Sequence, residues 1–169
     1  MEHRLDAALL GLLCTLPLAC QAPAMTVQAG EALPGDPERA AVERVLDDWH
    51  EAASKADGQR YFGHMTSDAI FLGTDASERW TQAEFRAYAE PYFARGQGWT
   101  YEPRERHVFL APGGTAWFDE RLWNAKYGEC RGSGVLRREG VEWRIAHYNL
   151  SFPIPNEVVP KLLELLAGR

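Results

Sequence analysis

The chain has 169 residues, of which 46% are hydrophobic and 25% charged, and its formal net charge is −6. This length corresponds to one domain, and the apolar fraction excludes a disordered chain. The mildly acidic balance lacks the positive field that gathers phosphates, so we expect no nucleic-acid partner. Gly and Pro are scattered, which excludes collagen-like and low-complexity classes.

An apolar run over residues 7–19 precedes Cys20. The run is too short to span a membrane but has the length of an export-signal core. Its end, Leu18-Ala19-Cys20, is similar to the cleavage site of bacterial lipoproteins, where the Cys becomes the lipidated first residue. We therefore predict a signal peptide over residues 1–20, lipidation of Cys20, and export to the cell envelope with membrane contact only through the lipid anchor.

Two alternatives remain for this segment. The first is cleavage after Ala22-Pro23-Ala24, which fits the small-x-small rule and would release a soluble protein into the periplasm. The second is a cytoplasmic protein with an apolar tail. Residues 21–36 are small, polar and rich in Pro and Gly, which predicts a flexible tether and leaves the domain at residues 37–169.

Helices come first along the domain. Asp36-Pro37 is typical of a helix start, and apolar residues then recur at three- and four-residue spacing up to Asp57-Gly58. We expect a short helix at 59–64 and a strand at 69–72. Thr81 and Glu84 form a capping box that starts another helix, which Pro91 should kink or end.

After Trp99 the apolar period changes to two. Short Gly-containing connections predict that neighbouring strands are antiparallel. The expected strands cover residues 99–110, 115–127, 129–138 and 142–152. Asn156 should cap a last helix, with Pro160 in its first turn. The order predicts an α+β domain whose curved antiparallel sheet wraps around the N-terminal helices and leaves a cavity at its open end.

Several segments in this order carry a resemblance to a known family. They are Phe71-Leu72-Gly73-Thr74-Asp75, Trp80 with the helix that follows it, Ala116 to Glu120, Arg131 to Leu136, and Trp143 to Ser151. Over residues 38–155 the chain resembles the SnoaL-like branch of the nuclear transport factor 2-like superfamily. The resemblance implies a cone-shaped α+β barrel with an interior pocket, often dimeric, but no particular reaction, because the superfamily contains cyclases, isomerases, dehydratases, hydrolases and binding domains.

Strand alternation places Trp117 and Asp119 on one face of the strand at 115–127, and Phe118, Glu120 and Leu122 on the other. If the family's cavity face is kept, Asp119, Arg131 and Ser133 point inward. Asp119 and Arg131 would then be an acid/base and anion-stabilising pair, with a structural ion pair as the alternative. His147 is a further catalytic candidate, or else a hydrogen-bonded sheet residue. The expected pocket residues are Trp49, Tyr88, Tyr92, Trp117, Asp119, Arg131 and Ser133, of which the helical aromatics are also explained as core.

The residue patterns support no metal site and no cofactor. Cys130 stands without Cys or His neighbours at ligand spacing, and no Gly-rich phosphate loop is present. Gly132-Ser133-Gly134 lies within a strand and is not a nucleophile elbow.

Three functions stay open. We favour a pocket that binds a small apolar or amphipathic molecule; the alternatives are an acid/base enzyme of the cyclase, isomerase or dehydratase type, and a dimeric association module. A shielded pocket with an isolated carboxylate would favour the enzyme, and a pocket filled by Trp and Tyr would favour association. We also expect a homodimer through the outer sheet face. The last strand carries Trp143 and Ile145 on one face and Ala146, Tyr148 and Leu150 on the other. Helices can cover only one of these faces, so we expect a second copy to cover the other.

Overall fold

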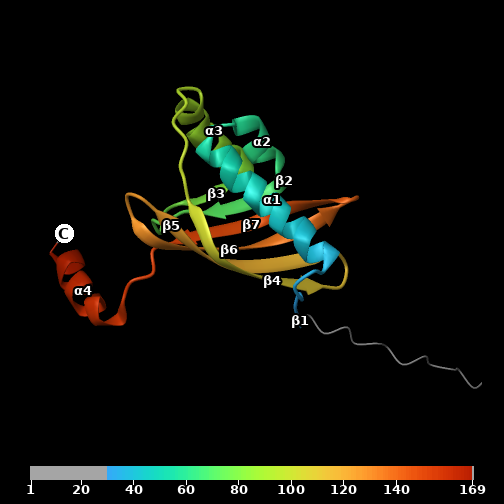
Figure 1. Ribbon diagram of the computed structural model, residues 1–169. Helices are drawn as coiled ribbons and strands as arrows, with labels where there is room; N and C mark the ends of the chain where they lie inside the picture. Colours follow the sequence, from blue (N-terminus) through green and yellow to red (C-terminus); the bar gives the residue numbers. More distant parts are fainter. Residues whose placement is uncertain (1–29, 169) are drawn as a thin grey trace, which may run out of the picture.

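Three helices cover one face of a curved sheet (Figure 1). The computed structural model describes residues 30–168, so the predicted signal peptide, Cys20 and most of the predicted tether lie outside the described residues. The helices are α1 (Pro37–Ser54), α2 (Gly58–Gly63) and α3 (Gln82–Phe93). This confirms the α+β fold with helices packed against a curved sheet, which is antiparallel except where β2 (Met65–Leu72) pairs with β7 (Glu142–Ser151).

The helix starts follow the local sequence signals. Asp36 accepts a hydrogen bond from the backbone N–H of Glu38 at 2.8 Å, as an N-cap residue does. Thr81 and Glu84 form the predicted capping box at the start of α3. Pro91 lies inside α3, which ends two residues later at Phe93.

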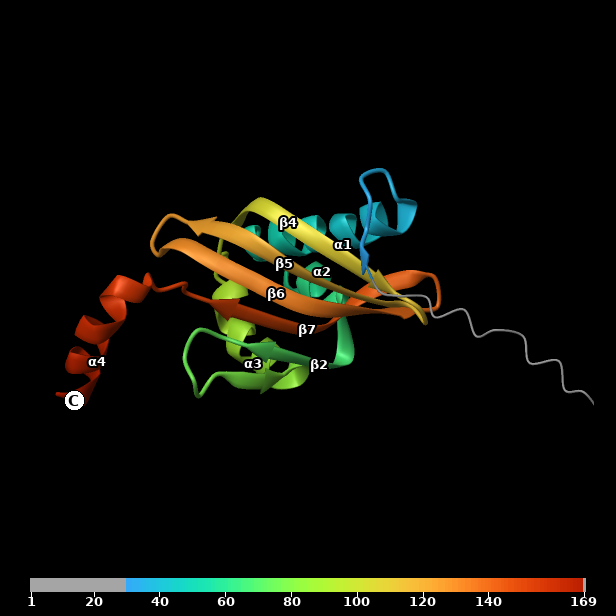
Figure 2. The same ribbon diagram turned by 90° about the horizontal axis from the view of Figure 1, so that it is seen from below.

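Seven strands form the sheet in the order β1-β4-β5-β6-β7-β2-β3. Their bounds are Gly30–Glu31 (β1), Met65–Leu72 (β2), Arg79–Thr81 (β3), Glu102–Ala111 (β4), Thr115–Asn124 (β5), Gly128–Glu139 (β6) and Glu142–Ser151 (β7). The predicted antiparallel run of four strands is confirmed as β4 to β7, which lie side by side in Figure 2. The short β2–β3 hairpin joins its edge, with β2 parallel to β7.

The predicted tether extends too far toward the domain. Gly30 and Glu31 pair with β4, and the Ala32 backbone carbonyl accepts a hydrogen bond from Arg39 at 2.7 Å. The pairing of Gly30 and Glu31, with a hydrogen bond of 2.8 Å from the Ala32 N–H to the Val108 carbonyl, covers the edge of β4, whose backbone groups would otherwise be open. Residues 30–32 therefore belong to the folded domain.

A bulge in β7 changes which residues share a face. Leu136 pairs with Ile145 and Val135 with His147, which leaves Ala146 as an extra residue. As a result, Trp143 and Ile145 lie on the same buried inner face as Tyr148 and Leu150. The argument for a partner on the outer face assumed strict alternation here, and the bulge removes that argument.

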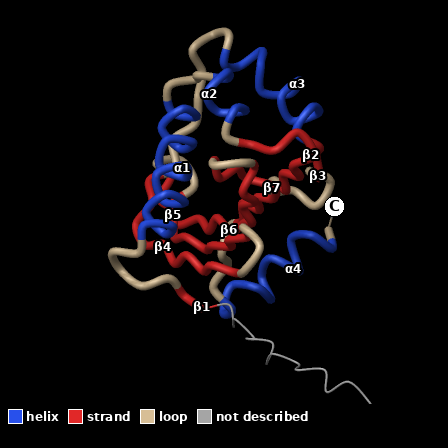
Figure 3. The backbone as a smooth tube through the Cα atoms, turned by 90° about the vertical axis from the view of Figure 1, so that its right-hand side faces the viewer, coloured by secondary structure: helices blue, strands red, loops and turns tan. Residues whose placement is uncertain are grey.

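The chain ends in a helix that stands clear of the body. After the 3-10 turn Asn156–Val158 comes α4 (Val159–Ala167), which lies apart from α1, α2 and α3 in all three views (Figure 3). Pro160 sits in its first turn as predicted, but Asn156 begins the 3-10 turn without a side-chain cap. Within residues 30–168, no helix has both the length and the apolar character needed to cross a membrane.

Candidate functional site

A carboxylate lies inside the cone, among apolar side chains. Glu120 is on the inner face of β5, and 1% of its surface is exposed. Its neighbours on that face are Phe118 and Leu122, both buried. The core around it is filled by large side chains, with Trp49 stacked on Tyr61 and edge-on to Tyr148. A charge in such surroundings requires partners.

Three elements supply those partners. Nε2 of His50, on α1, donates to Oε1 of Glu120 at 2.7 Å. Nε of Arg106, the residue opposite Glu120 on β4, donates to Oε2 at 2.8 Å and is joined through a terminal nitrogen to Asp47. The hydroxyl of Tyr148, on β7, donates to Oε1 at 3.4 Å. We call Glu120, His50, Arg106 and Tyr148 the polar quartet.

His50 and Arg106 stabilise the ionised form of Glu120. Burial alone would raise the pKa of Glu120, but the hydrogen bonds and charges of His50 and Arg106 hold that pKa below its ordinary value. Burial, and the nearby negative charge of Glu120, raise the pKa of Tyr148 well above its ordinary value. Glu120 is thus an ionised acceptor and Tyr148 a neutral donor.

Gly132 makes room for the polar quartet. It lies opposite Glu120 on β6, and a Cβ atom at this position would clash with the Tyr148 hydroxyl and lie 2.8 Å from Oε1 of Glu120. The absence of a side chain here lets the Glu120 and Tyr148 side chains meet above the sheet.

The structure contradicts the predicted inward face. Asp119 and Arg131 lie on the outer face and are exposed, and no ion pair joins them within the described residues. Ser133, the register partner of Asp119, is half-buried on that same face, and Trp117 stacks there on Phe109. His147 is half-buried and alternates with the inward Tyr148. The prediction of the inward face is wrong because both faces of β5 carry aromatic and charged residues, so alternation alone does not distinguish the buried face from the exposed one.

The predicted aromatic residues fall in two places. Trp49 belongs to the filled core. Tyr88 and Tyr92 are partly exposed on α3, at the mouth of a cleft at the open end of the cone. Sequence reasoning missed His50, Arg106, Glu120 and Tyr148. The signal for Glu120 was a lone charge in the alternating apolar series Phe118, Glu120, Leu122; the other three carried no comparable signal.

The cleft at the open end has a volume of about 490 Å³. We call it the aromatic cleft, because most of its lining is aromatic: Phe71, Trp80, Phe85, Tyr88, Tyr92, Trp99, Tyr101, Tyr127 and Phe152. Phe71 and Phe85 stack with ring centroids 3.9 Å apart, and Trp80 stacks on Phe85 at 5.3 Å. Polar groups stand at its rim, among them Glu78 and Lys126.

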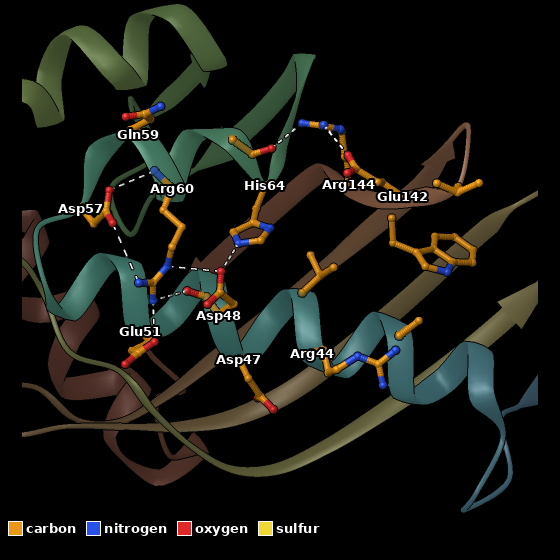
Figure 4. A pocket seen from close by; sticks show the side chains of 15 residues that line it. Arg44, Asp47, Asp48, Glu51, Asp57, Gln59, Arg60, His64, Glu142 and Arg144 are labelled. Atoms are coloured by element: carbon orange, nitrogen blue, oxygen red, sulfur yellow. Dashed lines mark hydrogen bonds and ion pairs between the residues drawn. The ribbon is translucent and has the colours of Figure 1, made fainter.

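A larger, charged groove of about 1170 Å³ runs between α1, α2 and the β6–β7 turn (Figure 4). Asp48 lies between Arg60 and His64, and Glu51 and Asp57 also pair with Arg60. Its charges are thus largely paired with one another at the surface. Small-molecule pockets are mainly apolar with a few polar groups, so chemistry favours the smaller aromatic cleft over the larger groove.

Comparison with known proteins decides the family. A family model described as SnoaL-like domain matches residues 42–155, which is most of the chain. The chain belongs to the SnoaL-like domain family. Within this SnoaL-like domain, the matched residues extend from α1 to the linker after β7 and so include the polar quartet and all the residues that line the aromatic cleft. No curated protein sequence is detectably similar to the chain.

Solved structures share the fold. A domain of unknown function with a cystatin-like fold from Nostoc punctiforme has a TM-score of 0.65 and 12% identity, covering 79% of this chain and 88% of that one. A nuclear transport factor 2-like protein of unknown function from Pseudomonas putida has a TM-score of 0.60 and 17% identity, covering 76% and 94%. A candidate scytalone dehydratase from Novosphingobium aromaticivorans has a TM-score of 0.59 and 10% identity, covering 69% and 85%. Identities this low show the fold alone.

Proposed function

We propose that this SnoaL-like domain binds a small, flat, largely apolar molecule in the aromatic cleft. The observation that carries the proposal is the cleft itself: a volume of about 490 Å³ lined by aromatic side chains. Ligand pockets of this size and character are typical of drug-sized organic molecules.

The orientation of the rings favours a planar ligand. Phe71, Trp80 and Phe85 stack on one another within 16–18° of parallel. Tyr88, which is 47% exposed, lies 15° from parallel to Phe85 and continues this stack at the surface. A planar apolar molecule gains most by stacking against such faces. Lys126 and Glu78 at the rim provide a place for one polar end of the ligand.

The polar quartet supports binding over acid/base catalysis. Glu120 is fully buried and already accepts hydrogen bonds from His50 and Arg106. The Tyr148 ring, which contacts it, packs against Phe71 of the cleft lining with centroids 5.6 Å apart. A general base must reach the proton that it abstracts, and Glu120 lies beneath this packed layer. We assign the quartet a structural role.

Ligand binding can be tested with an anilinonaphthalene sulfonate dye, an aromatic anion that contains a flat naphthalene ring system and fluoresces in apolar sites. We expect saturable binding, with quenching of Trp80 and Trp99 in the cleft. The double variant Tyr88→Ala/Tyr92→Ala should weaken binding about tenfold, because two aromatic contacts are lost.

The matched control is Trp123→Ala. Trp123 is 39% exposed on the outer face of the sheet, close to the 40% of Tyr92. Its removal should leave the dye affinity within about twofold of the wild type. Equal weakening by both changes, or dye binding without saturation, would overturn the proposal.

We place this binding function in the cell envelope. The support is the apolar run before Cys20, which lies outside the described residues. A domain on a lipid anchor would sample apolar molecules near the membrane surface, which agrees with the chemistry of the cleft.

A further inference from the structure

The helix α4 carries an apolar surface that its own chain leaves open. Leu163, Leu165 and Leu166 are between 48% and 64% exposed. The helix stands beyond the end of the sheet in Figures 1 and 2. Exposed leucines on a nine-residue helix are unfavourable in water. Leu163 and Leu166, three residues apart, share one face of the helix. Such an apolar face is typical of a helix that docks onto another surface.

The linker holds α4 away from its own cleft. It leaves β7 through Phe152-Pro153-Ile154-Pro155. Each proline restricts the residue before it to extended conformations, which disfavours a reversal of the chain at Phe152 or Ile154. Pro155 itself is extended, with φ −56° and ψ 133°. The linker therefore directs α4 away from its own domain. This favours docking of α4 onto a second molecule.

The aromatic cleft has a surface suited to α4. Tyr88, Tyr92 and Tyr127 at its mouth are each at least 40% exposed. The rim carries one charge of each sign, Glu78 and Lys126, and α4 also carries one of each, Lys161 and Glu164. Apolar surfaces with complementary charges at their edges are typical of a specific contact.

We propose that α4 of one copy packs over the aromatic cleft of a second copy, and that the exchange is reciprocal. A reciprocal exchange gives a closed two-fold dimer. Each ligand site is then completed by the partner's helix, which shields the bound molecule from water. The role of the ligand rests on the proposed function, whereas the exchange itself rests on α4, the linker and the cleft rim.

Light scattering of the full chain at micromolar concentration tests the dimer. The wild type should have twice the mass that mass spectrometry under denaturing conditions gives for its single chain. The double variant Leu163→Glu/Leu166→Glu should be monomeric. Val141→Glu is the control, because Val141 is 92% exposed on the β6–β7 turn and the change also replaces an exposed apolar side chain by a negative charge; this variant should remain dimeric.

Mixing two single-cysteine copies tests where α4 docks. One copy carries Leu166→Cys and the other Tyr92→Cys, each with Cys14→Ser, Cys20→Ser and Cys130→Ser. Exchange between copies predicts a disulfide-linked heterodimer under mild oxidation. If a single copy carrying both new cysteines closes on itself and the mixture stays unlinked, α4 covers its own cleft and the proposal fails.

The outer face of the sheet is the alternative dimer interface, and a substitution there tests the proposal further. If Trp117→Lys on the outer sheet face dissociates the dimer and Leu163→Glu/Leu166→Glu does not, the interface is the sheet face and α4 exchange is wrong. A dimer with the expected cross-link but no saturable dye binding would overturn only the proposed function. Dye binding by a monomer would overturn only the exchange.

Discussion

Glu120 and His50 are 70 residues apart in the chain, yet Oε1 of Glu120 lies 2.7 Å from Nε2 of His50 inside the cone. This contact joins α1 to the centre of the sheet. Arg106 extends it to β4, so one carboxylate connects the helical layer to two neighbouring strands. The domain thus places an ionic contact where a wholly apolar core would also be possible.

Removing the Glu120 charge should destabilise the domain strongly. Glu120→Gln leaves His50 and Arg106 without their shared anion in a buried setting, and breaking a buried pair costs about 3–5 kcal/mol. Asp119→Asn, at the next residue but on the exposed face, should change stability by about 0–1 kcal/mol. Urea unfolding of the two variants measures the difference, and similar small effects would contradict a structural role for Glu120.

Acid should destabilise the domain through protonation of Glu120. The folded-state pKa of Glu120 lies below its ordinary value of 4.5, so its contribution to stability is present above that pH. The contribution is lost as the pH falls through the lowered folded-state pKa, because the unfolded chain binds the proton first. Unfolding free energies measured from pH 6 to about pH 3 should fall less steeply for Glu120→Gln than for the wild type.

The control for this titration is Asp68→Asn. The exposed Asp68 carboxylate also has a lowered pKa, because Arg137 donates hydrogen bonds to it. Solvent screens an exposed pair, so this variant should follow the wild-type acid curve closely. Matching curves for the wild type and Glu120→Gln would refute the assignment.

Gly132→Ala should disrupt the packing of the polar quartet. The added Cβ would clash with the Tyr148 hydroxyl, and overpacking of a filled core costs about 1–3 kcal/mol. Tyr148→Phe removes that hydroxyl, so the double variant should lose less stability than the sum of the two single changes. Gly63→Ala, where a Cβ meets nothing within 4 Å, is the control. Additive losses would show that the Tyr148 hydroxyl is not the obstacle.

Lipidation should depend on Cys20 alone. In a bacterial host fed a fatty-acid probe, the wild-type chain should become labelled and Cys20→Ala should not. Cys14→Ala changes the other cysteine of the apolar segment and should remain labelled. Labelling of Cys20→Ala would exclude the anchor at this residue, and recovery of the unprocessed chain from the cytosol would exclude export as well.

Much of the fold was predictable because its signals are local. Asp36 and the Thr81–Glu84 capping box mark helix starts through hydrogen bonds that span only a few residues. The Gly-containing turns bring neighbouring strands together in chain order, which predicts the antiparallel run from β4 to β7. The family resemblance added the closure of the sheet around the helices.

The candidate site was less predictable, because it depends on which strand face points inward. Alternation separates Asp119 from Glu120 but does not say which of the two is buried, since both neighbour aromatic residues. The extra residue Ala146 then reverses the alternation within β7 and brings Tyr148 to the inner face. The bulge therefore removes the argument for a partner on the outer face, whereas the predicted site differs because the inward face of β5 carries Glu120 and not Asp119.

By itself, the sequence determined the starts of α1 and α3, the strand order of the central meander and the α+β class, since these follow from contacts between residues close in the chain. Only the tertiary structure decided that His50, Arg106, Glu120 and Tyr148 meet, and that Tyr88 and Tyr92 border a cleft. These groups come together through sheet register and the docking of α1 and α3 on the sheet. Both arise from the packing of the whole core, which no local pattern encodes.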